Sequence, residues 1–183
     1  MSGRLIYLIG PSGAGKDTVL RWFRDHPQHC PWVHVARRTI SRSAGDPHEP
    51  HEAVSAVEFQ RLREHGDFAL HWEANTLHYG VRHTELRPME RGIDVLVNGS
   101  RRFLPQARRR YPDLVAAYLT VPPHIQRARL LARGRETPEA IEARLARSAH
   151  LAAVIGQTDV ELVNDGTPED IARKLLQHLL ATR

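Results

Sequence analysis

The sequence predicts an α/β fold in which helices flank a parallel β-sheet. Short apolar runs alternate with helical patterns along most of the 183 residues, as in chains built from strand–helix units. A glycine-rich stretch over residues 10–18 follows the first apolar run and precedes the first helix. The length suits one domain with a proper core, so we expect a single domain over residues 1–183.

The glycine-rich stretch predicts a phosphate-binding loop. Gly10, Gly15 and Lys16 have the spacing G-x-x-x-x-G-K. Glycines allow positive φ and let backbone N–H groups wrap a polyphosphate, which the helix N-terminus also attracts. Lys16 can reach the β- and γ-phosphates, so we expect it to be catalytic. The residues predicted to bind the nucleotide here are Gly10, Pro11, Ser12, Gly13, Ala14, Gly15, Lys16, Asp17 and Thr18.

Asp17 departs from the usual pattern, which has Ser or Thr after the lysine. A carboxylate in the first turn of a helix is favoured by the helix dipole, which gives it a purely structural role. A carboxylate beside phosphates is repulsive unless a metal lies between them, so Asp17 is equally a candidate Mg²⁺ ligand. The sequence leaves both interpretations open.

Composition limits the class of protein. The net charge of +5 comes mainly from arginine, whose guanidinium binds phosphate in a bidentate way, although nucleic acid attracts the same charge. The single cysteine excludes an internal disulfide and fits the cytoplasm. No signal peptide or membrane-length apolar run is present. The 12 histidines lack a zinc-site pattern, so we expect no zinc site.

The first half of the chain contains an insertion between the predicted sheet strands. We expect the region of about 37–91 to bind the acceptor, with an arginine segment over 37–42 and an exposed loop over 43–52. Ser55 and Glu58 have the spacing of a capping box. The elements predicted are strands 5–9 and 33–36, a helix from Ser55 to Gly66, paired strands 68–74 and 77–81, and a polar helix 84–91.

The second half continues the strand–helix alternation. The predicted elements are strands 93–99, 114–121 and 160–164 and helices 101–111, from 122–123 to 134, from 137–138 onward, and from 168 onward. Ligands in such folds bind outside the carboxyl ends of the strands. We therefore expect the phosphate loop, residues 37–42, residues 98–101 and the turn after Asn164 to meet at one edge.

These motifs resemble the guanylate-kinase branch of the nucleoside monophosphate kinases. The matching stretches are Gly10–Lys16, Ser41-Arg42, Phe68 through Trp72-Glu73 to Tyr79-Gly80, and the lid-like Arg133-Gly134-Arg135. After Arg42, however, residues 43–46 lack the second arginine and the tyrosine that help that family hold GMP. The resemblance thus implies a nucleoside monophosphate kinase-like fold with a helical lid at about 127–150, and it counts against GMP as the acceptor.

A longer resemblance is to the ribose 1,5-bisphosphate phosphokinases of bacterial phosphonate degradation. It covers nearly the whole chain, and the matching stretches are Gly15–Asp17, 43–45, 71–75, 79–81, 94–101, 104–108, 133–136 and 164–166. This family transfers the γ-phosphoryl group of ATP to the 1-phosphate of ribose 1,5-bisphosphate and forms 5-phosphoribosyl 1-diphosphate. The resemblance implies this reaction, ATP and Mg²⁺.

Such an acceptor is a phosphate with a second pKa of about 6, so no strong base is needed. Alignment and charge neutralisation can carry the reaction. We predict catalytic roles for Arg133 and Arg135 in the lid and for Arg144, which shares a helix face with Arg147. A solvated basic surface is the alternative for these arginines.

The remaining predictions concern the acceptor and the metal. Arg38 and Arg42 are candidates for the acceptor phosphates, Tyr79 for a hydroxyl contact to phosphate, and Glu73 and Asn75 for the ribose hydroxyls. Asn98 and Ser100 end a strand where many phosphate-loop enzymes carry a Mg²⁺-directed acid. An amide cannot replace that charge, so we expect metal binding to rest more on Asp17 and on the phosphates themselves. Asn164 is placed near the adenine by resemblance alone. The predicted substrate-binding residues are Arg38, Arg42, Glu73, Asn75, Tyr79, Asn98 and Ser100.

Three other functions are compatible with parts of the sequence. One is a kinase for GMP or a related nucleoside monophosphate. Another is a non-catalytic guanylate-kinase-like module, which would be expected to lose the phosphate loop. The third is a nucleic-acid-binding ATPase, for which we find no interleaved aromatic and basic surface. We expect a small-molecule substrate, no nucleic acid and no membrane partner, and either a monomer or a homodimer.

Overall fold

The computed structural model describes residues 2–42, 50–132, 134, 137–153 and 156–182. Its central feature is a parallel sheet with strand order β2-β7-β1-β8-β9. The strands are β1 (Leu5–Ile9), β2 (Val33–Val35), β7 (Asp94–Asn98), β8 (Val115–Thr120) and β9 (Val160–Val163). The predicted α/β fold with a parallel sheet is confirmed.

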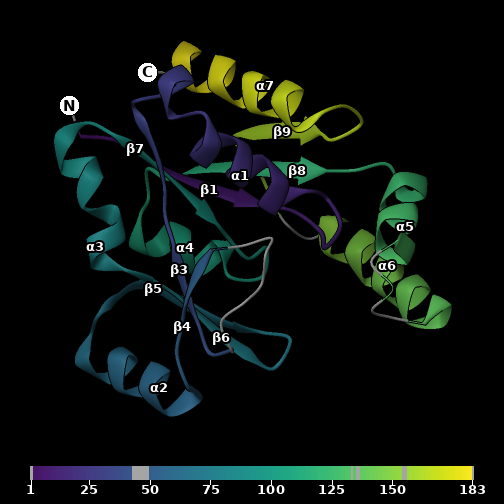
Figure 1. The fold of residues 1–183 in the computed structure, drawn as a ribbon, viewed down its shortest axis with the longest axis horizontal. Coiled ribbons are helices and arrows are strands. Elements are labelled where there is room, and N and C mark those ends of the chain that lie inside the picture. The colour runs from purple at the N-terminus through teal and green to yellow at the C-terminus, as the bar shows by residue number, and fades with distance from the viewer. Residues whose placement is uncertain (1, 43–49, 133, 135–136, 154–155, 183) are drawn as a thin grey trace.

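Helices cover both faces of this sheet. The described helical elements are α1 (Lys16–Asp25), η1 (Pro27–His29), α2 (Ala56–His65), α3 (His83–Leu86), η2 (Arg87–Arg91), α4 (Leu104–Arg110), α5 (Pro123–Ala132), α6 (Pro138–Ala153) and α7 (Pro168–Ala181). Figure 1 shows α1 and α7 side by side over one face. The opposite face packs against α4 and a second, smaller sheet.

The two faces follow from the sequence of β1, in which all five residues are buried. Ile6 and Leu8 point to the face that packs on α1 and α7, whereas Leu5, Tyr7 and Ile9 belong to the core shared with α4 and the second sheet. A parallel strand buried on both sides reads as a continuous apolar run, which is why this strand was predictable without any alternation of polar residues.

The second sheet has strand order β4-β3-β6-β5. Its strands are β3 (Arg38–Ile40), β4 (His51–Ala53), β5 (Phe68–Ala74) and β6 (Leu77–Arg82). The predicted pairing of residues 68–74 with 77–81 is confirmed as an antiparallel hairpin, and Ser55 caps α2 by accepting a hydrogen bond from the Glu58 backbone N–H. The second sheet lies at the lower left of Figure 1, across from α5 and α6.

Three sequence-based boundaries were wrong. The sequence predicts an exposed loop at residues 51–52, yet they begin β4, which pairs with β3 in parallel and so depends on a partner distant in sequence. The polar helix 84–91 is a short α3 followed by the 3₁₀ turn η2, since Pro88 lacks the N–H that an α-helix needs. The helix predicted from 101 begins only at Leu104. Residues 43–49 of the predicted loop lie outside the described residues.

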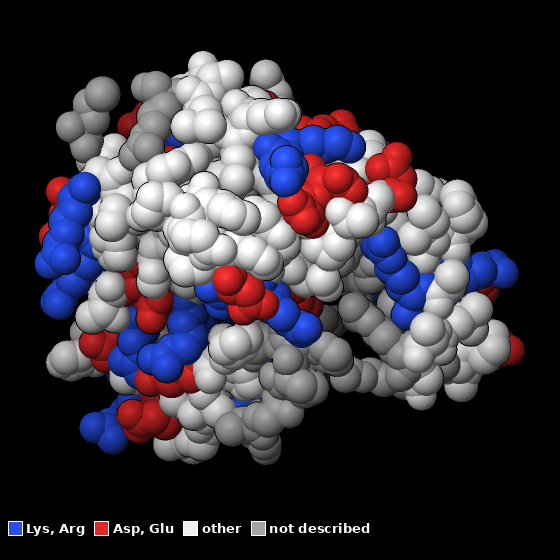
Figure 2. Space-filling view, turned by 45° about the horizontal axis from the view of Figure 1, so that its top comes forward, with Lys and Arg blue, Asp and Glu red and all other residues white. Residues whose placement is uncertain are grey.

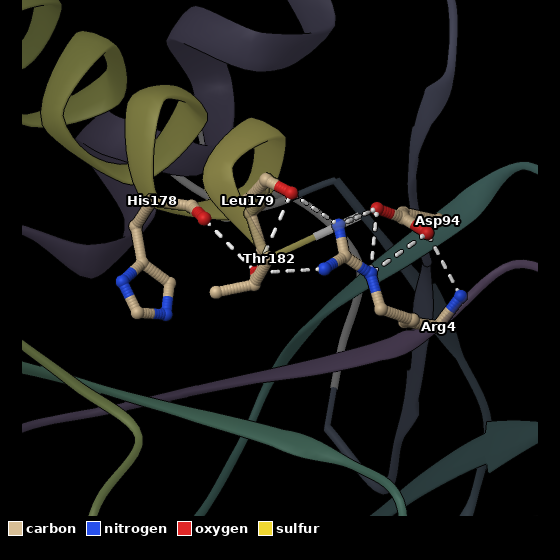
Figure 3. Close-up of polar contacts among 5 residues, drawn as sticks. All are labelled: Arg4, Asp94, His178, Leu179 and Thr182. Atoms are coloured by element: carbon tan, nitrogen blue, oxygen red, sulfur yellow. Dashed lines mark hydrogen bonds and ion pairs between the residues drawn. The ribbon is translucent and has the colours of Figure 1, made fainter.

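Asp94, at the start of β7, has a structural role. Its carboxylate is fully buried and lies 2.7 Å from the Nη2 atom of Arg4, which also donates to the Leu179 carbonyl at the end of α7 (Figure 3). The Arg4 backbone N–H donates to the Asp94 Oδ1 atom, and the Arg4 Nη1 atom donates to the Thr182 hydroxyl. These contacts join β1, β7 and α7 at the amino ends of the strands, the edge opposite the phosphate loop.

Charged side chains are mixed on the surface. On the face shown in Figure 2, acidic side chains lie beside most groups of basic ones, with wide uncharged areas between. Within the part of the chain that the structure describes, no helix is both long and apolar enough to cross a membrane.

Candidate active site

The glycine-rich loop lies at the carboxyl end of β1 and leads directly into α1, as predicted. Gly15 precedes the helix with φ of 90°, a conformation that side chains other than glycine rarely adopt. Gly10 is needed for a different reason: a Cβ atom there would lie 2.3 Å from the carbonyl oxygen of Leu119 on β8. The path of the loop backbone therefore requires glycine at two positions, at Gly15 because of its positive φ and at Gly10 because of the close approach of β8.

Two buried amides hold this loop from outside. The Nδ2 atom of Asn164, after β9, donates to the Ala14 carbonyl at 2.6 Å, and the Nε2 atom of Gln126 on α5 donates to the Ser12 carbonyl at 2.8 Å. Both residues are about 5% exposed, so the contacts are shielded from water. Asn164 was predicted to approach adenine; the structure gives its amide nitrogen a partner in the loop, and the adenine contact stays a prediction. Gln126 was not predicted at all.

Lys16 is the first residue of α1, and its side chain returns to the phosphate loop. Its Nζ atom donates to the carbonyls of Gly10 and Pro11, at 2.9 and 3.1 Å. The ammonium is thus kept at the rim of the loop by weak neutral acceptors. Phosphate oxygens form stronger charge-assisted hydrogen bonds than carbonyls do. The phosphates of a bound nucleotide can therefore replace the two carbonyls as acceptors for the Lys16 ammonium.

Asp17 and Asn98 meet beside the loop. The Asn98 Nδ2 atom, at the end of β7, donates to the Asp17 Oδ1 atom at 2.8 Å. Asn98 is almost fully buried, and its Oδ1 atom has no hydrogen-bond partner among the described residues. A carboxylate and an unpartnered amide oxygen are donors of the type that Mg²⁺ prefers, so this pair fits a magnesium ion. The sequence named both residues but did not foresee the contact.

Arg38 extends this group toward the second sheet. Its Nη1 atom donates to the Asn98 carbonyl at 3.3 Å, and its guanidinium lies 4.9 Å from the centre of the Tyr79 ring. Tyr79 is buried and stacks on Trp72 with ring centres 5.8 Å apart. The contacts from Asp17 through Asn98 to Arg38 therefore connect the phosphate loop with the predicted acceptor region.

Arg42 has a neighbour that the sequence did not suggest. Its Nε atom donates to the Nε2 atom of His51 at 3.4 Å, and His51 pairs with Arg38 across β3 and β4. Sequence reasoning treated His51 as one of several scattered histidines in an exposed loop. Its strand is only three residues long, too short for a period-two pattern, so no local signal could have found it.

Glu73 and Ser100 line one cavity of about 340 Å³ at the outer edge of β5. The Glu73 carboxylate lies 3.3 Å from the Nδ1 atom of His78 on β6. The Ser100 backbone N–H donates to the Tyr7 hydroxyl, and burial raises the pKa of Tyr7, which keeps this hydroxyl neutral. Asn75 is apart from this cavity, at the exposed hairpin turn with φ of 50°.

The lid is described only in part. Arg133 and Arg135 lie outside the described residues, whereas Arg144 is half-buried on α6 and Arg147 beside it is exposed. A cavity of about 780 Å³ separates α5 and α6 from the end of β8 and is bordered by Pro11 of the phosphate loop. Helices α5 and α6 therefore lie next to the loop, and their predicted role as a lid at about 127–150 stays a prediction.

Arg129 on α5 lies beside the phosphate loop and was not among the site residues predicted from the sequence. Its Nη1 atom is buried without a hydrogen-bond partner among the described residues, and a Cβ atom on Gly15 would lie 3.6 Å from it. Arg129 is three residues after Gln126, which binds the same loop, so the two share a helix face. That spacing was the signal available in the sequence.

Arg101 joins the segment after β7 to the lid. Its Nη1 atom donates to the Ser148 carbonyl of α6 at 3.1 Å. Burial lowers the pKa of the Arg101 guanidinium, partly offset by the neighbouring Tyr118. One half-buried cation thus connects the Asn98–Ser100 segment to α6.

No family model matches the chain, but known proteins do. It is 49% identical over 179 residues to the "Ribose 1,5-bisphosphate phosphokinase PhnN" of Pseudomonas paraeruginosa, covering 98% of this chain and 96% of the relative. Proteins of the same name from Azotobacter vinelandii and Yersinia pestis are 46% and 44% identical, covering 97% and 96% of this chain and 96% and 91% of theirs. The chain belongs to the PhnN family. The predicted family membership is confirmed.

Solved structures confirm the fold. A guanylate kinase from Anaplasma phagocytophilum superposes with a TM-score of 0.73, covering 99% of this chain and 86% of that one. The protein TT1252 from Thermus thermophilus superposes with a TM-score of 0.55 over all of both chains. At 19% and 18% identity these likenesses concern architecture alone, and they agree with the predicted nucleoside monophosphate kinase-like fold.

Proposed function

We propose that this PhnN-family protein transfers the γ-phosphoryl group of ATP to the 1-phosphate of ribose 1,5-bisphosphate. The products are 5-phosphoribosyl 1-diphosphate and ADP. The observation that supports a phosphate group as the acceptor is the series of contacts from Asp17 through Asn98 to Arg38. These contacts bring the Arg38 cation beside the phosphate loop. The ribose identity is supported by the names of the relatives.

The reaction is a direct displacement. An oxygen of the acceptor 1-phosphate forms a bond to the γ-phosphorus while the bond from that phosphorus to the β–γ bridging oxygen breaks, leaving ADP. The acceptor is already ionised near neutral pH, so no residue has to remove a proton. The protein aligns the two phosphates and neutralises their repulsion, which is how phosphoryl transfer is generally catalysed.

On the donor side, the loop backbone and Lys16 hold the β- and γ-phosphates. Arg129 and Arg144 approach from the lid helices, with Arg133 and Arg135 assigned there by the sequence. Asn164 and Gln126 act through the loop, because their amides bind its carbonyls and fix its path. They are positioning residues in this proposal.

On the acceptor side, Arg38 and Arg42 bind the reacting phosphate, with His51 and the Tyr79 hydroxyl as further donors. Asp17 and the Asn98 Oδ1 atom would hold Mg²⁺, which neutralises phosphate charge when bound. Glu73, Ser100 and Asn75 are assigned to the sugar. We further propose a cytoplasmic location and a small-molecule substrate with no nucleic-acid partner; a monomer and a homodimer are both compatible.

The test is ADP release with Mg-ATP against four acceptors: ribose 1,5-bisphosphate, ribose 5-phosphate, GMP and AMP. We expect turnover with ribose 1,5-bisphosphate alone and a diphosphate product in the phosphorus NMR spectrum. Turnover with GMP instead would make the protein a divergent guanylate kinase. No turnover with any of the four would contradict a kinase of this class.

A further inference from the structure

The cavity of about 340 Å³ at the edge of β5 has no role in the phosphate chemistry described so far. It lies between α2 and the segment from Ser100 to Gln106. Arg63 lines it from α2 and Arg102 from the opposite segment, while His71 and Glu73 line it from β5. Two arginines from distant parts of the chain therefore border one small space.

The charges around this cavity favour an anion. Glu73 is the one carboxylate among its described lining residues, and it lies beside His78, 3.3 Å from the imidazole. Burial lowers the pKa of His71, and the charges of Arg63 and Arg110 lower it further. Arg63 and Arg110 are thus close enough to act on the His71 imidazole electrostatically, in addition to the effect of burial.

The cavity adjoins the acceptor cations and lies on the side away from the phosphate loop. Trp72 lines it and stacks on Tyr79, whose ring carries the Arg38 guanidinium at 4.9 Å. Ser100, on the cavity wall, is two residues beyond Asn98, which contacts Asp17. The stacked Trp72 and Tyr79 rings thus connect the cavity wall with the Arg38 guanidinium.

We propose that this cavity binds the distal phosphate of a doubly phosphorylated sugar acceptor, through Arg63 and Arg102. The inference rests on the proposed function. An acceptor with a phosphate at each end needs two anion sites, and the site at Arg38 and Arg42 holds only the phosphate that reacts. The cavity supplies the second site and selects bisphosphates over monophosphates.

The experiment compares two acceptors that differ only in the distal phosphate, ribose 1,5-bisphosphate and α-ribose 1-phosphate. For each enzyme, kcat/KM is measured with both, and the ratio is the quantity of interest. Arg102→Gln and Arg63→Gln should each lower the ratio about tenfold, as expected for the loss of one charge-assisted contact. The matched controls are Arg109→Gln on α4 and Arg61→Gln on α2, exposed arginines that do not line the cavity.

A ratio that stays at the wild-type value in both Arg102→Gln and Arg63→Gln overturns the proposal, as does an equal fall in the controls. Free inorganic phosphate is a second possible ligand of the cavity, and calorimetry measures whether the protein binds it. Phosphate binding that the two substitutions abolish while the ratio is unchanged would make this a separate ion site and would also overturn the assignment. If wild-type enzyme turns over GMP and neither sugar, the proposed function fails, which is a distinct result.

Discussion

The phosphate loop and the second sheet meet at the candidate site but are held by different kinds of contact. The loop is fixed by Gly10, whose replacement would clash with backbone, by Gly15, which has a positive φ, and by buried amides that bind the loop carbonyls. The second sheet is also joined by contacts between polar side chains that are partly open to solvent, such as Arg82 with Glu52 and His78 with Glu73. The side-chain contacts of the proposed donor half thus end on loop backbone, whereas those of the proposed acceptor half join one side chain to another.

This difference has a consequence for mutation. A contact that shapes backbone supports every ligand atom bound to that backbone, so its loss should affect both stability and donor binding. A side chain that binds the acceptor should affect that one ligand. Four substitutions, taken from the largest expected effect to the smallest, test whether the two halves respond in these separate ways.

Lys16→Ala should lower kcat at least about a hundredfold, because it removes the mobile cation from the transferring phosphate. Thermal unfolding should stay near that of wild type, since Lys16 is only half-buried and bonded to two loop carbonyls. The control is Lys174→Ala, which alters the chain's other lysine, exposed on α7. Near-normal turnover would contradict the assignment of the loop as the phosphate-binding site.

Asn164→Ala should lower the free energy of unfolding by about 1–3 kcal/mol, because it leaves the buried Ala14 carbonyl without its partner. The KM for ATP should rise with it, since the loop loses a support. Denaturant unfolding and initial rates measure the two effects, with the exposed amide variant Gln177→Ala as the control. A changed KM for ATP at unchanged stability would mean that Asn164 contacts the nucleotide directly, as the sequence suggested.

Arg42→Ala should raise the KM for the acceptor about tenfold through the loss of one charge-assisted contact. The KM for ATP should not change, because Arg42 follows β3 of the second sheet and bonds to His51 on β4. Initial rates at varied ATP and varied acceptor separate the two constants, and Arg87→Ala is a matched exposed control. A weaker ATP interaction would show that the division into donor and acceptor halves is wrong.

Glu52→Gln should have the smallest effect, about 1 kcal/mol or less, because the pair with Arg82 is partly exposed. Burial raises the pKa of Glu52, but hydrogen bonds from Arg82 and Thr39 outweigh burial, so its pKa falls below the usual 4.5. A lowered pKa in the folded protein stabilises it above pH 4.5, and this contribution is lost as pH falls through the folded value.

The measurement for Glu52→Gln is urea unfolding between pH 7 and pH 3. The difference in stability between wild type and variant should be present at pH 7 and shrink below pH 4.5. Glu64→Gln, on the exposed side of α2, is the control for a glutamate-to-glutamine change elsewhere on the surface. A difference that does not change with pH would mean that Glu52 acts through its packing and not through its charge.

Local sequence patterns were sufficient wherever a neighbouring residue sets the conformation. The continuous apolar run of β1, the Ser55 cap of α2 and the glycines of the phosphate loop each act over a few residues, and each was predicted. The patterns failed where the partner lies far along the chain. β4 exists because it pairs with β3, and residues 101–103 stay out of α4 while Arg101 bonds to α6 and Phe103 stacks on Trp72.

The sequence by itself determined that a phosphate loop follows the first strand of a parallel sheet, because spacing and residue type fix that backbone locally. It also indicated which arginines to consider. Only the tertiary structure decided that Asn98 fixes Asp17, that Asn164 and Gln126 hold the loop, and that His51 lies beside Arg42. These contacts join residues that are 9 to 150 positions apart in the sequence. The packing of strands and helices brings such residues together, and a local sequence pattern cannot predict that packing.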